Sequence, residues 1–424
     1  MRSVSRRAVG SWCLYDWANQ GFATLVVTFI YSAYFVDAFA PDERVGTALW
    51  SRGIVVSSIL IALLSPIMGA VADRSGSRKR WLFTTTLLCI AATVGLAFVR
   101  PSQANAVLIA LTIFVIANVA YELSMVFYNA FLPDLAPQSH IGRISGYGWS
   151  LGYVGGVLCL VLALFAFVGL VGEPWFPLAT EEGFNIRATN LLVGGWFLLF
   201  SIPLFLTVPD TKGSGSGVDL KGAWGDLKDT LLQITEYREV VKFLFARLVF
   251  NDGLVTVFAF ASIYAMGTFG MSFSEVILFG IAISLTGAVG ASAFGFFDDR
   301  LGAKMTILVS LVGLSAATVI AVVAPNRFWL WVGGLTVGIF AGPNQSASRS
   351  LMGRFVPQRH QSEFFGFFAF SGKATSFLGP LLLGILSQAY GQRVGVSSIL
   401  IFFVVGGLLL LTVSEERGIE AAAP

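Results

Sequence analysis

Five ionisable side chains interrupt long apolar stretches of the sequence, and these residues are the most able to do chemistry. They are Asp16, Glu122, Arg247, Asp252 and Lys373. On insertion scales an ionisable group within an apolar span costs at least about 2.5 kcal/mol, and it usually faces a water-filled cavity. The alternative interpretation is that these groups form structural ion pairs or interhelical hydrogen bonds. Glu122 fits that alternative least well, because it lies far from both ends of its apolar run.

Other polar residues share a helical face with these groups. Residues three or four positions apart are neighbours on a helix surface. Arg247 and Asp252 are five positions apart, about 140° around the helix, so they cannot pair within it. Three sets of the residues predicted to bind a substrate or a coupling ion therefore share a helix face: Asp16 with Asn19; Asn118 with Tyr121 and Glu122; and Arg247 with Asn251. The other residues predicted for this role are Asp252, the clustered Asn344 and Gln345, and Lys373.

The composition indicates the elements that must position these residues. The chain has 424 residues, of which 56% are hydrophobic and 12% are charged, and its mean hydropathy is +0.78. A soluble globular protein carries about twice that share of charge. The composition excludes a disordered chain, a soluble enzyme and a nucleic-acid-binding protein, and the net charge of +3 does not indicate an anionic partner.

Apolar runs bounded by charges or by Pro and Gly predict an all-α membrane protein with twelve transmembrane helices. The predicted spans are 12–36, 50–72, 81–99, 104–130, 144–170, 188–208, 241–267, 274–297, 304–324, 328–349, 362–388 and 394–413.

The distribution of basic residues predicts the orientation. With both termini in the cytoplasm, 19 Lys and Arg residues fall on the inner side and 6 on the outer side. Cytoplasmic loops carry the excess of basic residues in membrane proteins. The inner count includes Arg349 and Arg354, which the predicted spans place at the inner end of one helix and in the loop after it. The sequence therefore predicts cytoplasmic termini, and the compact loops favour the inner membrane of a bacterium.

A polar connection divides the chain into two halves. Residues 213–217 alternate Gly and Ser, a flexible composition. After them, apolar residues recur every three or four positions among charges, which predicts an amphipathic helix on the inner membrane face. We therefore expect a six-helix bundle at 1–208, a cytoplasmic linker at 209–240, a second six-helix bundle at 241–413 and a cytoplasmic tail at 414–424.

The two halves repeat one another. Residues 69–78 and 295–304 both read G-x-x-x-D-R-x-G-x-[RK]. A second set of identities is offset by 220 residues: Pro137/Pro357, Gln138/Gln358, His140/His360, Gly146/Gly366 and Gly152/Gly372. Parallel repeats are typical of transporters whose substrate site lies near the middle of the membrane, between the halves.

These residues also carry a resemblance. The repeated loop resembles the signature loop of the major facilitator superfamily, although Ser77 stands where that loop usually has a basic residue. The strings at 14–19, 128–134, 251–253 and 348–352 resemble the branch that contains the vacuolar amino-acid effluxers of autophagy and their bacterial relatives. The resemblance covers essentially the whole chain. It implies a rocker-switch fold and solute transport, with helices 1, 4, 7 and 10 lining one cavity.

The repeated loop predicts a gate. Its acid can bind an arginine or the N-terminus of a neighbouring helix, and such a contact would latch the inner side in one state and break in the other. This role rests mainly on the resemblance. The predicted gating residues are Gly69, Asp73, Arg74, Gly76, Arg78, Asp134, Arg143, Asp299 and Arg300.

No cofactor or metal is predicted. Cys13, Cys89 and Cys159 lie far apart, and the chain has two histidines, His140 and His360, which we interpret as loop residues. No phosphate-binding G-x-x-x-x-G-K-[ST] occurs, so ATP hydrolysis is not expected.

The leading hypothesis is a secondary active transporter of a small polar solute such as an amino acid, working by alternating access in a lipid bilayer. Asp16 or Glu122 would bind the solute's ammonium group, and Arg247 or Lys373 its carboxylate. A drug or metabolite exporter coupled to a proton or another ion is the nearest alternative. A membrane sensor or enzyme is the alternative of another class, although the sequence lacks the soluble domain or the His, Cys and carboxylate clusters that these need.

Overall fold

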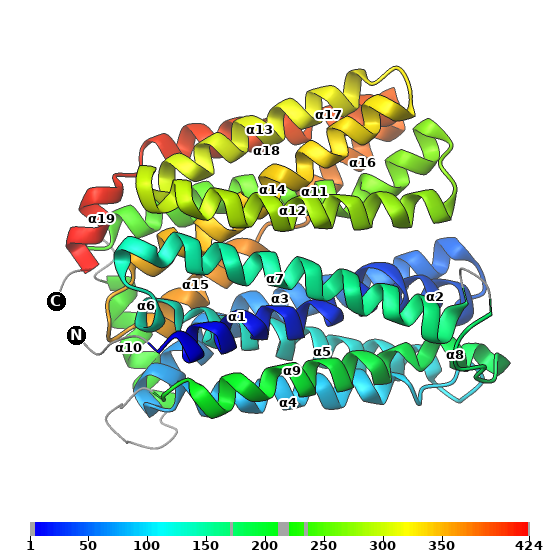
Figure 1. The fold of residues 1–424 in the computed structure, drawn as a ribbon, viewed down its shortest axis with the longest axis horizontal. Helices are drawn as coiled ribbons and strands as arrows, with labels where there is room; N and C mark the ends of the chain where they lie inside the picture. The colour runs from blue at the N-terminus through cyan, green and yellow to red at the C-terminus, as the bar shows by residue number, and fades with distance from the viewer. Residues whose placement is uncertain (1–4, 170–172, 211–219, 233–235, 423–424) are drawn as a thin grey trace. The chain divides into compact units, whose positions relative to one another are not determined.

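The computed structural model describes residues 5–169, 173–210, 220–232 and 236–422. Over these ranges the regular structure is entirely helical, as the sequence predicts (Figure 1). The chain forms two compact units. The first unit comprises 1–61, 77–128 and 151–211, and the second comprises 62–76, 129–150 and 212–424. Two long helices, α3 (Glu43–Ser75) and α7 (Ile141–Ala163), contribute residues to both units.

The first unit is organised around α1 (Arg6–Gly21), which packs against α9 (Thr189–Thr207). Trp17 of α1 stacks on Trp196 of α9, with ring centroids 5.6 Å apart. A π-helical segment at Phe22–Phe29 continues α1. The remaining helices of this unit are α2 (Tyr31–Ala38), α4 (Arg78–Leu96), α5 (Ala106–Asn129), the π-helical η3 (Leu164–Val168), the 3₁₀ turn η4 (Glu181–Gly183) and α8 (Phe184–Arg187).

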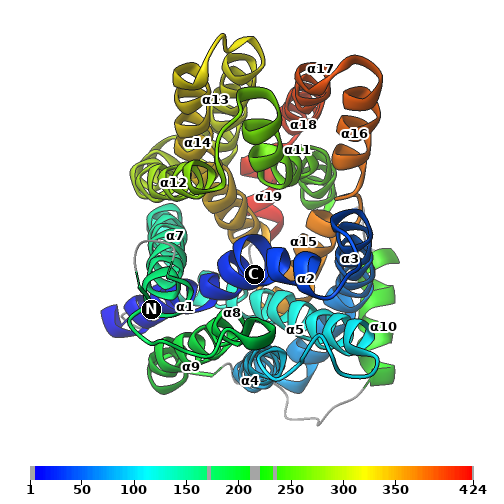
Figure 2. The ribbon, with the colours of Figure 1, turned by 90° about the vertical axis from the view of Figure 1, so that its right-hand side faces the viewer.

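In the second unit α14 (Arg327–Phe355) lies between α12 (Phe273–Leu301) and α13 (Ala303–Val323) (Figure 2). Glycines let α14 approach α12 closely, since a Cβ at Gly338 would lie 2.3 Å from the Ile283 carbonyl oxygen. The other helices of this unit are α6 (Leu132–Leu135), η2 (Gln138–His140), α10 (Leu220–Leu232), α11 (Arg238–Phe269), α15 (Gln361–Lys373), α16 (Leu378–Tyr390), α17 (Gln392–Ser397), α18 (Ile399–Leu411) and α19 (Glu415–Ala422).

Ten helical segments among the described residues are long and apolar enough to cross a membrane. The predicted spans 81–99 and 328–349 are not among them, although both are helical as α4 and α14. Three basic residues open α4, and the second half of α14 is polar, so neither helix has a uniformly apolar window. A total of twelve spans therefore remains a prediction.

The span predicted at 362–388 agrees with a candidate membrane span at Gln361–Tyr390, within which residues 374–377 separate α15 from α16. One predicted boundary needs correction. Helix α14 continues beyond residue 349 to Phe355, and Arg349 and Arg354 are buried. These two arginines are thus buried residues of α14 and not exposed loop residues, and the side of the membrane on which they were counted stays a prediction.

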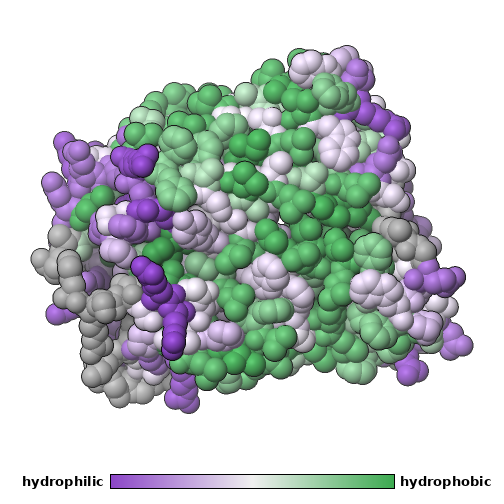
Figure 3. Space-filling model, viewed as in Figure 1, coloured by the Kyte–Doolittle hydropathy of each residue, from purple (hydrophilic) through white to green (hydrophobic). Residues whose placement is uncertain are grey.

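Large apolar side chains are exposed on the flanks of both units. Leu206 of the first unit is 78% exposed, and Val312 of the second is 71% exposed. Hydrophobic residues cover most of the face in Figure 3, and hydrophilic residues gather toward the helix ends. A soluble monomer rarely exposes so much contiguous apolar surface. These exposed apolar side chains are suited to contact with the lipid of a membrane.

Candidate functional site

In the first unit, the predicted polar stripes of α1 and α5 meet. The Tyr121 hydroxyl donates to Asn19 Oδ1 at 3.4 Å, and Asn19 Nδ2 lies 3.4 Å from Asp16 Oδ1. Asp16 and Asn19 are buried, and Glu122 is half-buried one residue beyond Tyr121. Asn118 instead donates to Ser57 Oγ of α3 at 2.8 Å. The structure therefore brings Asp16, Asn19 and Tyr121 into one chain of contacts inside the unit.

In the second unit, Arg247 of α11 binds α15. Its Nη1 donates to the Phe368 carbonyl oxygen at 2.6 Å and to Ser371 Oγ at 2.7 Å. Its guanidinium also lies 3.6 Å from the centroid of the Phe368 ring, a cation–π contact. Asn251, one turn further along α11, donates to the Gly372 carbonyl oxygen at 3.0 Å. These contacts satisfy backbone groups close to the end of α15.

The other predicted residues of the second unit lie on α11, α14 and α15. Asp252 is buried on α11, and Asn344 of α14 donates to Ser310 Oγ of α13 at 2.9 Å. Gln345 is half-buried, and Lys373 is the last residue of α15, directly before the break in that span. The predicted residues thus fall into two groups, one in each unit, and each group joins neighbouring helices of its own unit.

Asp299, near the end of α12, caps the start of α7. Its Oδ1 accepts from the Gly142 backbone N–H at 2.9 Å, and its Oδ2 lies 2.5 Å from Nε of Arg143. Arg354 of α14 adds a longer ion pair to Asp299, at 3.8 Å. An acid at a helix N-terminus is stabilised by the free N–H groups and by the helix dipole.

Asp73, near the end of α3, caps the start of α15 in the matching way. Its two oxygens accept from the backbone N–H groups of Ser362 at 3.0 Å and Glu363 at 2.9 Å. Gly69, one turn earlier in α3, has no room for a side chain, because a Cβ there would lie 2.2 Å from the Ser362 carbonyl oxygen. We call these two arrangements the Asp73 latch and the Asp299 latch. The end of the helices where they lie is the latch end.

The other predicted gating residues surround the two latches. Arg74 pairs with Asp226 of α10 at 2.8 Å, and Asp134 accepts from Gln361 Nε2 at 3.0 Å. Gly76 has a φ of 64°, which favours glycine at the turn after α3. Arg78 is buried at the start of α4, and Arg300 is exposed at the end of α12.

The sequence analysis did not single out two buried arginines of α14. Arg349 donates to Ser145 Oγ at 2.9 Å, to the Ser145 carbonyl oxygen at 2.7 Å and to Asn129 Oδ1 at 3.3 Å. Arg354 pairs with the buried Asp298 at 2.6 Å. The repeat offset could have found Arg349, because residue 349 and residue 129 are also 220 positions apart.

His360 is a loop residue, as predicted, and it also contacts the first turn of α15. Its Nδ1 lies 3.0 Å from Oε2 of Glu363, whose backbone N–H is part of the Asp73 latch. Its repeat partner His140 is exposed and contacts Ser139 at 2.8 Å. A sequence spacing of three residues is compatible with the His360–Glu363 pair, but the spacing does not show that the carboxylate is buried.

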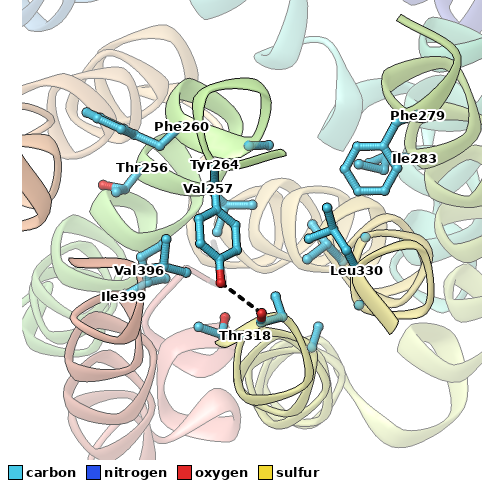
Figure 4. Close-up of a pocket in the computed structure, with 16 residues that line it drawn as sticks. Thr256, Val257, Phe260, Tyr264, Phe279, Ile283, Thr318, Leu330, Val396 and Ile399 are labelled. Carbon is cyan, nitrogen blue, oxygen red and sulfur yellow. Dashed lines mark hydrogen bonds between the residues drawn. The ribbon is translucent and has the colours of Figure 1, made fainter. Parts of the chain in front are cut away.

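A cavity in the second unit, with room for about 60 Å³, is almost entirely apolar. Phe260, Phe279 and Leu330 are among the residues that line it (Figure 4), and the Tyr264 hydroxyl beside them donates to the Ala321 carbonyl oxygen at 3.0 Å. A polar solute would find few hydrogen-bonding partners there. This cavity is therefore not the candidate site.

Comparison with known proteins identifies the family. A family model described as "Vacuole effluxer Atg22 like" matches residues 46–423. The chain belongs to the Atg22-like family. This agrees with the branch of the major facilitator superfamily that its motifs resemble.

Members of this family include bacterial and fungal proteins. MFS-type transporter YxiO of Bacillus subtilis is 27% identical over 417 residues, which are 97% of this chain and 96% of YxiO. Autophagy-related protein 22 of Cryptococcus neoformans is 30% identical over 299 residues, 65% of this chain and 53% of the fungal protein. The matched region is therefore about half the length of the fungal relatives.

Solved structures show the same fold at low sequence identity. The human organic anion transporter MFSD10 superposes with a TM-score of 0.74 at 15% identity, over 96% of this chain and 99% of that one. The proton:xylose symporter XylE gives a TM-score of 0.76 at 14% identity, over 97% and 96%. The Atg22-like chain is an integral membrane protein with the major facilitator fold, and its relatives are transporters rather than enzymes.

Proposed function

We propose that this Atg22-like protein is a secondary active transporter of a small zwitterionic solute, with amino acids as the leading substrate class. The observation that carries this proposal is the presence of buried acids and half-buried bases inside otherwise apolar helices. Asp16 and Asp252 are buried, and Arg247 is held at the end of α15. A zwitterion needs an acid for its ammonium group and a base for its carboxylate. The name of the family supports efflux, but the direction of transport is part of the proposal.

We further propose that the two latches hold the latch end closed during one half of an alternating-access cycle. Asp73 and Asp299 each cap the first turn of a helix from the other sequence repeat. These charge-assisted bonds are strong while they are formed, and they break when the helix ends separate. The proposed cycle therefore opens the latch end by releasing both aspartates.

In this proposal the latch end faces the cytoplasm, both termini lie on that side, and a bacterial inner membrane holds the protein. Twelve membrane-spanning helices, including α4 and α14, complete the proposed topology. The excess of basic residues in the loops of this end supports the orientation. The bacterial relative YxiO, which matches over nearly its whole length, supports the location.

The experiment that tests the substrate class is a thermal-shift screen of the purified protein against amino acids, sugars and lipophilic cations. A ligand present at 100 times its dissociation constant stabilises the folded state by about 2.7 kcal/mol. We expect at least one amino acid to raise the melting temperature and to exchange in proteoliposomes. Stabilisation and exchange with lipophilic cations alone would replace this proposal with the exporter alternative.

Arg247→Gln is the matched variant for the screen, because it removes the charge proposed to bind the carboxylate. We expect it to abolish stabilisation by amino acids. Arg359→Gln, an exposed arginine in the loop before α15, serves as the control and should retain it. Stabilisation by amino acids that survives Arg247→Gln would remove Arg247 from the proposed site.

A further inference from the structure

The two latches differ in the charge that accompanies them. Arg143 follows Gly142 at the start of α7 and pairs with Asp299 at 2.5 Å. At the start of α15 the residue 220 positions later is Glu363, and its backbone N–H binds Asp73. The Asp299 latch thus carries a neutralising arginine, whereas the Asp73 latch carries a second acid at the matching position. Two carboxylates close together destabilise the state that holds them there.

A histidine faces this second acid. His360 Nδ1 lies 3.0 Å from Glu363 Oε2, and the Glu363 side chain is only 1% exposed. The other carboxylate oxygen of Glu363, Oε1, is buried and has no hydrogen-bond partner among the described residues. The His360 side chain is 35% exposed and is therefore within reach of water. A buried carboxylate joined to a solvent-accessible imidazole is an arrangement that can take up one proton.

The surroundings of His360 are mainly acidic. Asp73 lies at the end of α3, Asp226 lies on α10, and Asp134 binds Gln361 from the segment after α5. The pKa of His360 is raised from its ordinary value of 6.5, chiefly by its hydrogen bond to Glu363, with smaller contributions from Asp73 and Asp226.

Further ionisable groups lie near this cluster. Arg74 is already paired with Asp226 at 2.8 Å, and Arg359 is exposed in the same loop as His360. Tyr237, just before α11, has its pKa raised by partial burial and by Glu236 and Glu363. Tyr237 therefore stays neutral, whereas His360 can titrate near neutral pH.

We propose that His360 and Glu363 form a proton-binding site that controls the Asp73 latch. A proton on His360 neutralises the charge of Glu363 beside Asp73 and stabilises the closed latch end. Loss of that proton leaves two acids at the start of α15, and the latch end opens. This inference rests on the gating role proposed above for Asp73, and it names the proton as a ligand of that gate.

The sign of the pH dependence follows from the raised pKa of His360. The closed state binds the proton more tightly than an open state in which the pair has separated. The stabilisation is fully present below the ordinary histidine pKa of about 6.5, and it is lost as the pH rises through the raised value. Each unit of difference between the two pKa values changes the closed-to-open ratio about tenfold across that window.

The test uses pulsed electron–electron double resonance to measure the distance between two spin labels at the latch end, with the protein in lipid nanodiscs. Cysteines at Gln138 and Gln358 carry the labels, because both residues are exposed, are repeat partners, and lie outside the latches. The buried native cysteines Cys13, Cys89 and Cys159 are replaced by serine or alanine. We expect the closed, short-distance population to dominate at about pH 5.5 and to fall at least severalfold at about pH 8.5.

The variants separate the proton site from the gate. His360→Gln and Glu363→Gln should each remove most of this pH response, whereas His140→Gln, which changes the exposed repeat partner, should retain it. Asp73→Asn should shift the distances toward the open state at every pH. A pH response that persists in both His360→Gln and Glu363→Gln would overturn the proton site even if Asp73→Asn opens the latch end. Unchanged distances in Asp73→Asn would instead refute the gating role on which it rests.

Discussion

At the residue scale, Arg349 joins segments from the two sequence repeats at the latch end. Its three donor atoms bind Ser145 of α7 and Asn129 of α5, and the arginine is fully buried. Buried charges need such a complete set of partners, because removing one partner exposes the cost of desolvation. Arg349 and Asn129 are also repeat partners in the sequence, so the bond links corresponding points of the two halves.

Arg349→Lys is expected to lower the free energy of unfolding by about 2 kcal/mol. A lysine ammonium cannot reproduce the three divergent donors of the guanidinium, and each hydrogen bond to a charged group contributes about 1.5–3 kcal/mol. The measurement is the melting temperature in detergent, with the exposed Arg359→Lys as control. Equal melting temperatures for the two variants would contradict the structural role of Arg349.

Glu122→Gln tests the half-buried carboxylate of α5. We expect this variant to keep its melting temperature, to lose concentrative transport and to retain solute exchange, because exchange does not need a coupling ion to leave. Proteoliposome counterflow and gradient-driven uptake are the two measurements. If the melting temperature falls while both transport activities stay normal, Glu122 is a structural residue.

The latch aspartates could be predicted from the sequence because a ten-residue pattern repeats around them. The proton site proposed at His360 could not be predicted from the sequence. It depends on the burial of Glu363 and on the approach of α3, neither of which the local sequence encodes. The buried contacts of Arg349 could not be predicted either, because its partners Asn129 and Ser145 are about 200 residues away in the sequence. The stripes of α1 and α5 were predictable, since helical spacing alone places those residues on one face.

At the element scale, close helix approach at glycine holds the latch end together. Gly366 of α15 packs on α3, where a Cβ would lie 2.4 Å from the Ser65 carbonyl oxygen. Its repeat partner Gly146 of α7 packs on α12, where a Cβ would lie 2.4 Å from the Ala291 carbonyl oxygen. Small residues allow such backbone contacts between membrane helices. Both glycines lie about one turn along their helices from the backbone N–H groups that the latch aspartates bind.

Gly366→Ala is therefore expected to shift the labelled pair at Gln138 and Gln358 toward longer distances, because the added methyl group cannot fit in the closed arrangement. Gly384→Ala on α16 is the matched control, since a Cβ at Gly384 meets nothing within 4 Å. Spin-label distances at one fixed pH compare the two variants. Equal distributions in Gly366→Ala and Gly384→Ala would show that the packing of α15 on α3 does not limit opening.

Sequence reasoning placed the helices well where the apolar runs are uniform. It missed the full length of α14 and the short break between α15 and α16, although the predicted span 362–388 agrees with the candidate membrane span Gln361–Tyr390. In α14 several buried polar side chains bind residues of other helices, as Asn344 binds Ser310 and Ser350 binds Asp298, so the helix continues where hydropathy ends. In the split span the side chain of Asn251 donates to the Gly372 carbonyl oxygen, one of the last carbonyls of α15, and nothing in the local sequence indicates this partner.

At the scale of the whole molecule, the topology is accessible to cysteine labelling. Gln138 and Gln358 are exposed at the latch end, and Thr180 is exposed in the segment between α7 and α9. With both termini in the cytoplasm, cysteines introduced at Gln138 and Gln358 should react with a membrane-permeant reagent but not with an impermeant one. A cysteine introduced at Thr180 should react with both reagents. Reaction of all three with the impermeant reagent in intact cells would contradict the proposed orientation.

In the proposed transport cycle, release of Asp73 and Asp299 from the helix starts that they cap opens the latch end. Asp299 binds backbone N–H groups and two arginines, whereas Asp73 binds the start of α15 beside an acid. Asp73→Asn and Asp299→Asn should each open the latch end in part, and the double variant should open it most. Each lost charge-assisted contact is worth about 1.5–3 kcal/mol.

The most direct measurement is the spin-label distance between Gln138 and Gln358 in the Asp73→Asn/Asp299→Asn double variant, compared with the parent protein in the same nanodiscs. We expect a new, longer distance to become the major population in the double variant. A distribution that stays the same as that of the parent protein, with the variant folded and at the parent melting temperature, would refute the proposed gating by the two aspartates.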